Sequence, residues 1–412
     1  MSFIDRARAQ RLLGEAGIDA LVLLQPESFG YATGASPGVA ASWRRAGAAI
    51  AVVPAAADGA LAAVVTDLAA PSVRAAGTVG DLRVHPMWVD GADVSALRPS
   101  NRPIGELIAE AQARDPGFAR PETFDPRRGF ALLRDILVER GLLGARLGIE
   151  LDFLPVNDYA LLKAAIPEVA WVDSSPLLAR LRMVKTPGEI AILRQAVAFT
   201  EAGLRAATAD LRAGVTRDAI AERWRDGAVA AARAAGGPAV ERTWEYVAVG
   251  TNPWGGGALA PGDTLKFDVG CIIRGYSSDC GRTFVFGRAD AHQREVHAAL
   301  RAGFDAGMAA FRPGNTLADV HAAASAAIRV GGLPGFSRGH FGHGVGANVW
   351  TEEWPFVSAT ATIPLEADMV LAFETPFYVD GLGAFIIEDE VLVTASGAEP
   401  LNTMPRELIE LG

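Results

Sequence analysis

The chain has 412 residues, of which half are apolar, and a formal net charge of -10 from 48 Asp and Glu against 38 Lys and Arg. This length favours two domains, each with its own core. The negative charge and the lack of a Lys/Arg cluster argue against a nucleic acid or an anionic membrane as a partner. Charged residues stand at the N-terminus, where a signal peptide needs an apolar run, so the sequence predicts a cytoplasmic protein.

Residues 1–175 alternate between helix and strand patterns. Helical periodicity covers residues 4–16, 130–139 and 155–165, and apolar strand-like runs cover 20–24, 48–53 and 146–150. Turn signals stand at residues 25–26 and 34–38. This alternation predicts an α/β domain.

Residues 176–412 begin with helical patterns and continue with strands. Thr186 and Pro187 are typical of an N-cap and a first turn, and they predict a helix to residue 211, followed by a second helix over 217–235. Strand patterns cover 244–249, 264–273, 276–286, 369–379 and 384–394, with helices at 292–311 and 317–329 between them. The pattern predicts an α+β domain with an antiparallel sheet.

Two aspartates flank a short turn in this second part. If Arg274 and Gly275 form a two-residue hairpin loop, Asp268 lies opposite Gly281, and Asp279 points to the same face as Asp268. Their α-carbons are then about 7–8 Å apart, close enough for both side chains to reach two metal ions about 4 Å apart. Solvated carboxylates on an exposed strand are the alternative.

The only two cysteines, Cys271 and Cys280, lie in the same hairpin. Each is an odd number of residues from the aspartate on its own strand, so the thiols point away from the carboxylates. Their diagonal placement is also poor for a disulfide. We therefore expect both to be reduced core residues.

Three further residues complete a set of candidate metal ligands. His343 stands in a glycine-rich segment, residues 339–346. Glu374 and Glu388 interrupt apolar strands, and they face each other directly if their connection is centred on Gly381. A glutamate in an apolar strand needs a partner or a cation. Two Asp, one His and two Glu suit two divalent ions, for which we expect manganese, with cobalt, iron or zinc as alternatives.

The contexts of these residues resemble the pita-bread metallohydrolases, the family of methionine aminopeptidase, aminopeptidase P, prolidase and creatinase. The resemblance rests on Phe267-Asp-Val-Gly270, Ser278-Asp-Cys-Gly-Arg-Thr-Phe284, Gly342-His-Gly-Val-Gly346, Phe373-Glu-Thr-Pro376 and Ile387-Glu-Asp389, together with residues 29–34 and 181–190. It implies a creatinase-type N-terminal domain over 1–175 and a pita-bread catalytic domain over 176–412. It also implies that Asp268 binds one ion, that His343 and Glu374 bind the other, and that Asp279 and Glu388 bridge them.

The chain departs from the peptidases of that family at three places. Trp350 stands where they carry a second His, seven residues after the metal-binding one. Residues 250–257 lack the His that they carry upstream of the first Asp, and Ile386 stands where prolidase-like relatives carry an Arg. Because the missing imidazoles act as proton donors and oxyanion partners in peptide cleavage, we expect a substrate other than an Xaa-Pro peptide.

Five residues are candidates for substrate binding. They are Trp254, Trp350 and Trp354 near the metal motifs, His340, and Arg44 of an N-terminal loop, which in a homodimer can reach the site of the partner subunit. Tryptophans in a pocket suit a flat aromatic or a cationic molecule. Packing or dimer contacts are the alternative for the tryptophans, and a surface position is the alternative for the arginine.

The preferred function is hydrolysis of a C–N bond in a small amide, an amidine or a modified amino acid. Glu374 is the candidate to accept a proton from the attacking water. A genuine Xaa-Pro aminopeptidase or dipeptidase, a metal-assisted lyase and a catalytically inactive binding protein on the same fold are the alternatives. We expect a small-molecule or short-peptide substrate and a homodimer.

Overall fold

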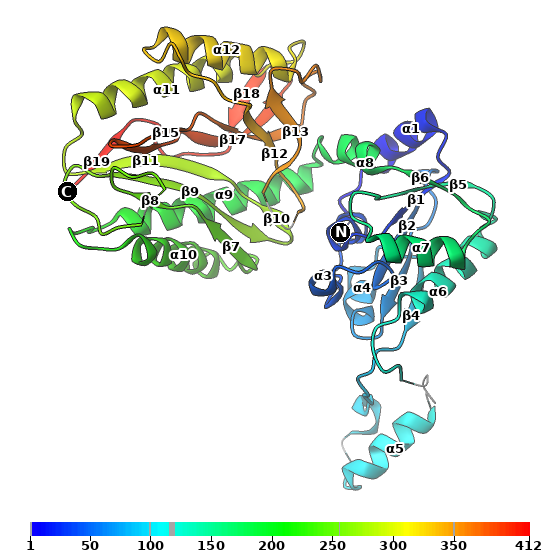
Figure 1. Cartoon of the computed structure of the whole chain (residues 1–412). Helices are drawn as coiled ribbons and strands as arrows, with labels where there is room; N and C mark the ends of the chain where they lie inside the picture. The colour runs from blue at the N-terminus through cyan, green and yellow to red at the C-terminus, as the bar shows by residue number, and fades with distance from the viewer. Residues whose placement is uncertain (1, 99, 115–119, 255, 349–350) are drawn as a thin grey trace. The chain divides into compact units, whose positions relative to one another are not determined.

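The chain consists of two compact units, Met1–Leu178 and Ala179–Gly412 (Figure 1). The computed structural model describes residues 2–98, 100–114, 120–254, 256–348 and 351–412. The domain boundary expected after residue 175 falls at the start of helix α8 (Ser175–Arg182) and stays a prediction. None of the helices in the described ranges is both long and apolar enough to cross a membrane.

The first unit is built on a six-stranded mixed sheet with the order β4-β3-β2-β1-β5-β6. Strand β1 is antiparallel to β2 and parallel to β5. Buried side chains such as Val22, Val52 and Phe130 form its core. The strands are β1 (Ala20–Leu23), β2 (Ala49–Pro54), β3 (Ala62–Thr66), β4 (Asp81–His85), β5 (Arg146–Ile149) and β6 (Ala170–Asp173). The helices before α8 are α1 (Arg6–Ala16), α2 (Pro26–Thr33), α3 (Ala40–Trp43), α4 (Ala70–Ala76), the 3-10 helix η1 (Ser95–Leu97), α5 (Ile104–Arg114), α6 (Pro126–Glu139) and α7 (Val156–Ala165).

Helix α2 corrects the turn predicted at residues 25–26. It begins at Pro26, which fits a first helical turn because the N–H that proline lacks has no partner there anyway. Phe29 on this helix is fully buried, so packing adds to the local preference. The helix ends at Gly34, whose backbone is left-handed.

The second unit is an eleven-stranded sheet between two pairs of helices (Figure 1). Its main path is β10-β9-β11-β17-β14-β12-β13, with β18 on β17, β19 on β11, and β7 and β8 on β9. The helices are α9 (Pro187–Thr208), α10 (Arg217–Ala234), α11 (Ala291–Ala310) and α12 (Leu317–Val330). The strands of this sheet are β7 (Arg242–Glu245), β8 (Ala248–Val249), β9 (Thr264–Ile273), β10 (Tyr276–Ser277), β11 (Cys280–Phe286), β12 (His340–Gly344), β13 (Glu353–Ser358), β14 (Val370–Glu374), β17 (Glu388–Thr394), β18 (Gly397–Pro400) and β19 (Ile409–Leu411). Strands β15 (Phe377–Val379) and β16 (Gly383–Phe385) form a separate two-stranded sheet.

Each pair of helices covers one side of this sheet, with α9 and α10 on one side and α11 and α12 on the other (Figure 1). Trp224 of α10 belongs to the same buried cluster as Phe267 of β9. On the other side, the ring of Phe304 in α11 lies 5.1 Å from that of Phe373 in β14. Strands in the middle of the sheet are therefore covered on both sides, and carboxylates on them are withdrawn from water.

Candidate metal centre

The hairpin of β9 and β11 places the first two candidate ligands as predicted. Asp268 pairs with Gly281 across the ladder, which confirms the register expected from a two-residue turn. Arg274 and Gly275 both have positive φ angles, 49° and 78°, as a tight hairpin turn of this type requires. Asp279 is buried, whereas the side chain of Asp268 is 19% exposed.

Three neighbouring strands supply the other candidate ligands. His343 of β12 pairs with Ala372 of β14, and Glu374 of β14 lies directly opposite Glu388 of β17, as predicted. Glu388 also lies opposite Gly281 of β11. A β-carbon on Gly281 would come within 2.8 Å of Glu388 Oε2, so the missing side chain leaves the space that this carboxylate occupies.

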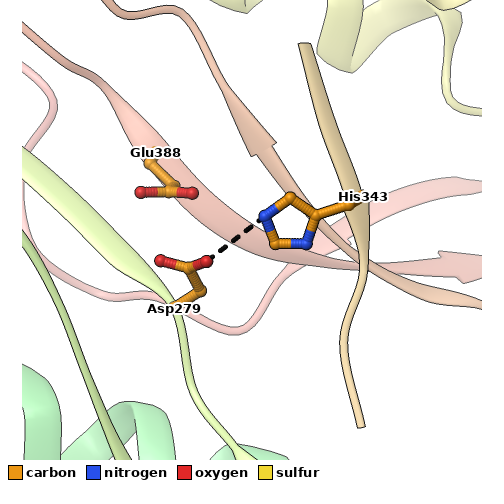
Figure 2. A group of neighbouring side chains, drawn as sticks. All are labelled: Asp279, His343 and Glu388. Carbon is orange, nitrogen blue, oxygen red and sulfur yellow. Dashed lines mark ion pairs between the residues drawn. The ribbon is translucent and has the colours of Figure 1, made fainter. Parts of the chain in front are cut away.

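Asp279, His343 and Glu388 form a compact group in which the side chains point toward one another (Figure 2). Each offers one ligand atom, and these atoms all lie within 4.8 Å of one another. His343 Nε2 is 3.4 Å from Asp279 Oδ2, which also accepts a hydrogen bond of 2.8 Å from the hydroxyl of Thr351. Two carboxylates and an imidazole are a donor set that suits a divalent transition-metal ion.

Two buried oxygens of this group have no hydrogen-bond partner among the described residues, namely Asp279 Oδ1 and Glu388 Oε2. Burial raises the pKa of Asp279 to about 6, although His343 opposes the shift. The pKa of Glu388 is raised well above its usual value, first by burial and then by repulsion from Asp279. Uncompensated buried carboxylates are costly, and a cation between them would remove the cost, so the residues present fit a metal ion.

His343 is held in an orientation that fits metal binding. Its Nδ1 lies 3.0 Å from the carbonyl oxygen of Gly344 and donates to it, so Nε2 faces Asp279. Burial by itself opposes protonation, but the contact with Asp279 outweighs it and raises the pKa of His343 to about 9. A backbone acceptor on the second ring nitrogen is the usual support of a metal-binding histidine.

The other two predicted ligands line the same cavity, of about 420 Å³, but each pairs with a basic side chain. Lys266 Nζ donates to Asp268 Oδ2 over 2.7 Å, and Arg338 Nη2 donates to Glu374 Oε1 over 2.5 Å. Sequence reasoning missed both basic residues. Lys266 had a signal, because it is a lone charge beside Asp268 in an otherwise apolar strand.

The predicted substrate-binding residues lie in different places. Trp254 lines the cavity, is 73% exposed, and stacks on Tyr378 with ring centroids 5.0 Å apart. Trp354 packs instead against the buried cluster beneath α11 and α12. The ring of His340 lies 6.4 Å from that of His343, but His340 is outside the described lining.

Two more of these candidates are not placed at the cavity. Arg44 belongs to the first unit, where it forms an ion pair of 2.8 Å with Glu27 and lies over the ring of Phe153. That Arg44 reaches the site of a partner subunit in a homodimer stays a prediction. Trp350 lies outside the described residues.

Comparisons with known proteins cover nearly the whole chain. The model of metallopeptidase family M24 matches residues 191–395, and the model of the creatinase/prolidase N-terminal domain matches residues 6–184. The chain is 29% identical to an Xaa-Pro dipeptidase of Lactobacillus helveticus over 264 residues, which are 63% of this chain and 71% of that protein. It is 28% identical to an Xaa-Pro dipeptidase of Pyrococcus furiosus over 250 residues, 60% of this chain and 70% of that one. The solved structure of an Xaa-Pro dipeptidase from Bacillus anthracis is similar with a TM-score of 0.77, at 21% identity and over 98% of this chain and 99% of that one.

Proposed function

Since the chain belongs to metallopeptidase family M24 and is a metal-dependent hydrolase, we propose that it cleaves the C–N bond of a small amide or short peptide in the cavity around Asp279, His343 and Glu388. The cavity of about 420 Å³ lies in the range of small-molecule sites. Family membership alone leaves the substrate class and the site open.

The observation that carries this proposal is the pair of buried oxygens without a partner in the described part of the chain, Asp279 Oδ1 and Glu388 Oε2. They lie beside the imidazole of His343 and within a cavity that a ligand can enter. If these residues were purely structural, the two oxygens would be buried without any hydrogen-bond partner or counter-charge. Buried polar groups rarely lack such a partner. A cation-binding role supplies the missing partner.

The roles of the side chains follow from their contacts. A divalent ion held by Asp279, His343 and Glu388 would supply Lewis acidity, which would polarise a substrate carbonyl and make water reactive near neutral pH. Glu374 lines the cavity with its carboxylate oriented by Arg338, and we assign it the acceptance of a proton from that water. The hydroxyl oxygen of Tyr378 accepts a hydrogen bond of 3.3 Å from Lys266, so its own hydrogen can point to a substrate oxygen. Tyr378 would then take over part of the role of the histidine missing from residues 250–257.

The charge of the cavity wall favours a substrate with an amino group. Five carboxylates line the cavity against two basic side chains: Asp268, Asp279, Glu352, Glu374 and Glu388 against Lys266 and Arg338. Each basic side chain is paired with one of these carboxylates, and a bound divalent ion would neutralise Asp279 and Glu388, so the wall keeps the negative charge of Glu352. The rings of Trp254 and Tyr378 add a surface on which a cation or a flat group can lie.

An Xaa-Pro dipeptide is the second candidate substrate. The relatives of Lactobacillus helveticus and Pyrococcus furiosus are named Xaa-Pro dipeptidases, which favours it. The residues that line the cavity argue against an Xaa-Pro dipeptide, because His343 is the single histidine among the described lining residues. Ile386, where prolidase-like relatives carry an arginine, is fully buried and also lies outside that lining.

The test is a substrate panel with the metal-depleted protein and the same protein reloaded with Mn²⁺. Small amides and dipeptides without proline that carry a free amino group should be cleaved only by the loaded protein, and faster than Xaa-Pro dipeptides. Isotopically labelled water should appear in the acid product, whereas products without label would indicate a lyase. Absence of Mn²⁺-dependent turnover for every substrate class would contradict the proposal. The manganese, the homodimer and the cytoplasmic location expected from the sequence stay predictions.

A further inference from the structure

Lys266 is a buried cation at the wall of the candidate metal cavity. The sequence contains three lysines, at positions 163, 185 and 266, and the last of these lines the cavity. Its side chain is 3% exposed, and its Nζ lies 2.7 Å from Asp268 Oδ2 and 3.3 Å from the hydroxyl of Tyr378. The ammonium is also 5.3 Å from the centre of the Tyr378 ring. These contacts hold the positive charge against one oxygen of Asp268.

Glu374 has a basic partner of the same kind. Arg338 Nη2 lies 2.5 Å from Glu374 Oε1, and the exposure of these two side chains is only 24% and 10%. The four carboxylates among the predicted ligands therefore fall into two classes. Asp268 and Glu374 each face a cation, whereas Asp279 and Glu388 each keep a buried oxygen without a partner among the described residues.

We propose that Lys266 supplies the positive charge at Asp268 that a second divalent ion would otherwise supply, so that the protein holds one ion tightly, between Asp279, His343 and Glu388. This inference rests on the proposed function, since it concerns the ion that the hydrolase uses. Two bound ions are expected from the sequence, whereas this inference gives the protein one tightly bound ion and a second site that is weak or absent.

Charge and space both favour this assignment. One divalent ion would neutralise Asp279 and Glu388, each of which keeps one oxygen without a partner in the described part of the chain, and the ammonium and the guanidinium already neutralise the other two. A second ion about 4 Å from the first would compete with Lys266 for the carboxylate of Asp268. It would also be repelled by the ammonium at short range in a poorly solvated site. Lys266 is thus a positioning residue, which determines where the ion lies.

The experiment counts the Mn²⁺ ions bound per chain. Full-length protein is stripped with a chelator and titrated with Mn²⁺, while free Mn²⁺ is followed by electron paramagnetic resonance and bound metal by elemental analysis. Wild type should bind one ion, with any second ion at least about 100-fold weaker. Lys266→Met, which removes the charge at similar volume, should bind two ions with affinities within about tenfold of each other.

Two variants serve as controls. Lys163→Met removes an exposed lysine of the first unit and should bind one ion, like wild type. Asp268→Asn, which keeps the shape of a part-exposed side chain, should also bind one ion, because Asp268 does not hold the tight ion in this assignment, but more weakly than wild type, because the ammonium of Lys266 loses its counter-charge. If Lys266→Met does not fold, the number of ions that Asp268→Asn binds tests the inference instead.

Three results would overturn the inference. They are two ions of comparable affinity in wild type, a single ion in folded Lys266→Met, or loss of a bound ion in Asp268→Asn. Two ions in an active, Mn²⁺-dependent wild type would overturn this inference and leave the proposed function standing. No bound Mn²⁺ and no hydrolysis would overturn both.

Discussion

Strand β17 carries a buried carboxylate on each of its two faces, and only one of the two is paired with arginines. Asp389 is fully buried and accepts hydrogen bonds of 2.7 Å from both Arg282 and Arg406. Its neighbour Glu388 is just as buried, yet its Oε2 has no partner among the described residues. Because adjacent strand residues point to opposite faces, one face has a complete ion-pair cluster and the other has an incomplete one. The incompleteness marks the face that needs a ligand.

The largest effect is expected for Glu388→Gln, which changes the incomplete face. Loss of the metal removes several kcal/mol of transition-state stabilisation, so turnover should fall by about 10³-fold. The metal-free variant should be as stable as metal-free wild type or more stable, because a neutral amide ends the repulsion from Asp279. Rate measurements with Mn²⁺ and urea unfolding without it test both parts. A variant that is inactive because it is unfolded would remove the distinction between the faces.

Asp389→Asn probes the complete face and should affect stability instead. It leaves the buried Arg282 without its carboxylate, and breaking a buried ion pair in this way costs about 3–5 kcal/mol. Mn²⁺ affinity of the folded variant should stay within about threefold of wild type. Urea unfolding and Mn²⁺ titration measure the two quantities. A stable variant that has lost its Mn²⁺ site would show that the two faces are not separate.

A somewhat smaller effect is expected for His297 of α11, a buried histidine that lies near Arg301 and Arg282. Burial first, and then Arg301 and Arg282, lower its pKa to about 4, although Glu407 opposes the shift. Because this lies below the unfolded value of about 6.5, the folded state binds fewer protons in between. The contribution to stability is full above pH 6.5 and is lost as the pH falls toward 4.

The measurement for His297 is urea unfolding of wild type and His297→Gln at several pH values. Between pH 7 and pH 4 the wild type should lose about 3 kcal/mol more than the variant. Equal losses in the two proteins would mean that this histidine is not kept neutral by its surroundings.

The smallest effect is expected for Trp254→Ala at the rim of the cavity. Trp254 is 73% exposed and touches Tyr378 by stacking, so its removal should leave stability within about 0.5 kcal/mol of wild type. If its ring binds substrate, KM should rise by about 3- to 10-fold with kcat unchanged, as expected for an exposed cation–π or stacking contact. Steady-state kinetics on the best amide substrate test this. A fall in kcat alone would place the ring in the chemistry instead.

Much of the site's backbone was predictable because strand geometry is regular. The turn at Arg274 and Gly275 fixes the partner of Asp268, and a connection centred on Gly381 fixes Glu374 opposite Glu388; both registers are confirmed. The predicted fold, a creatinase-type N-terminal domain followed by a pita-bread catalytic domain, is confirmed by the family and structural matches. Alternation and ligand order carry this information in the sequence itself.

Contacts between distant side chains could not be predicted in the same way. Arg338 is 36 residues from Glu374, and Arg282 is more than 100 from Asp389, so only the folded sheet brings each pair together. Trp354 looked like a pocket residue from its neighbours in the sequence but packs against the core of the second unit. No periodicity shows whether a charged residue has a charged partner, and this is the property that separates Glu388 from Asp389.

The most direct measurement is an anomalous difference map from a crystal of the protein grown with Mn²⁺. We expect the strongest peak between Asp279 Oδ1, His343 Nε2 and Glu388 Oε2, on the incomplete face of β17. A Mn²⁺-containing crystal with no peak at these three residues, or with its strongest peak elsewhere in the chain, would contradict the assignment of this group as the metal site.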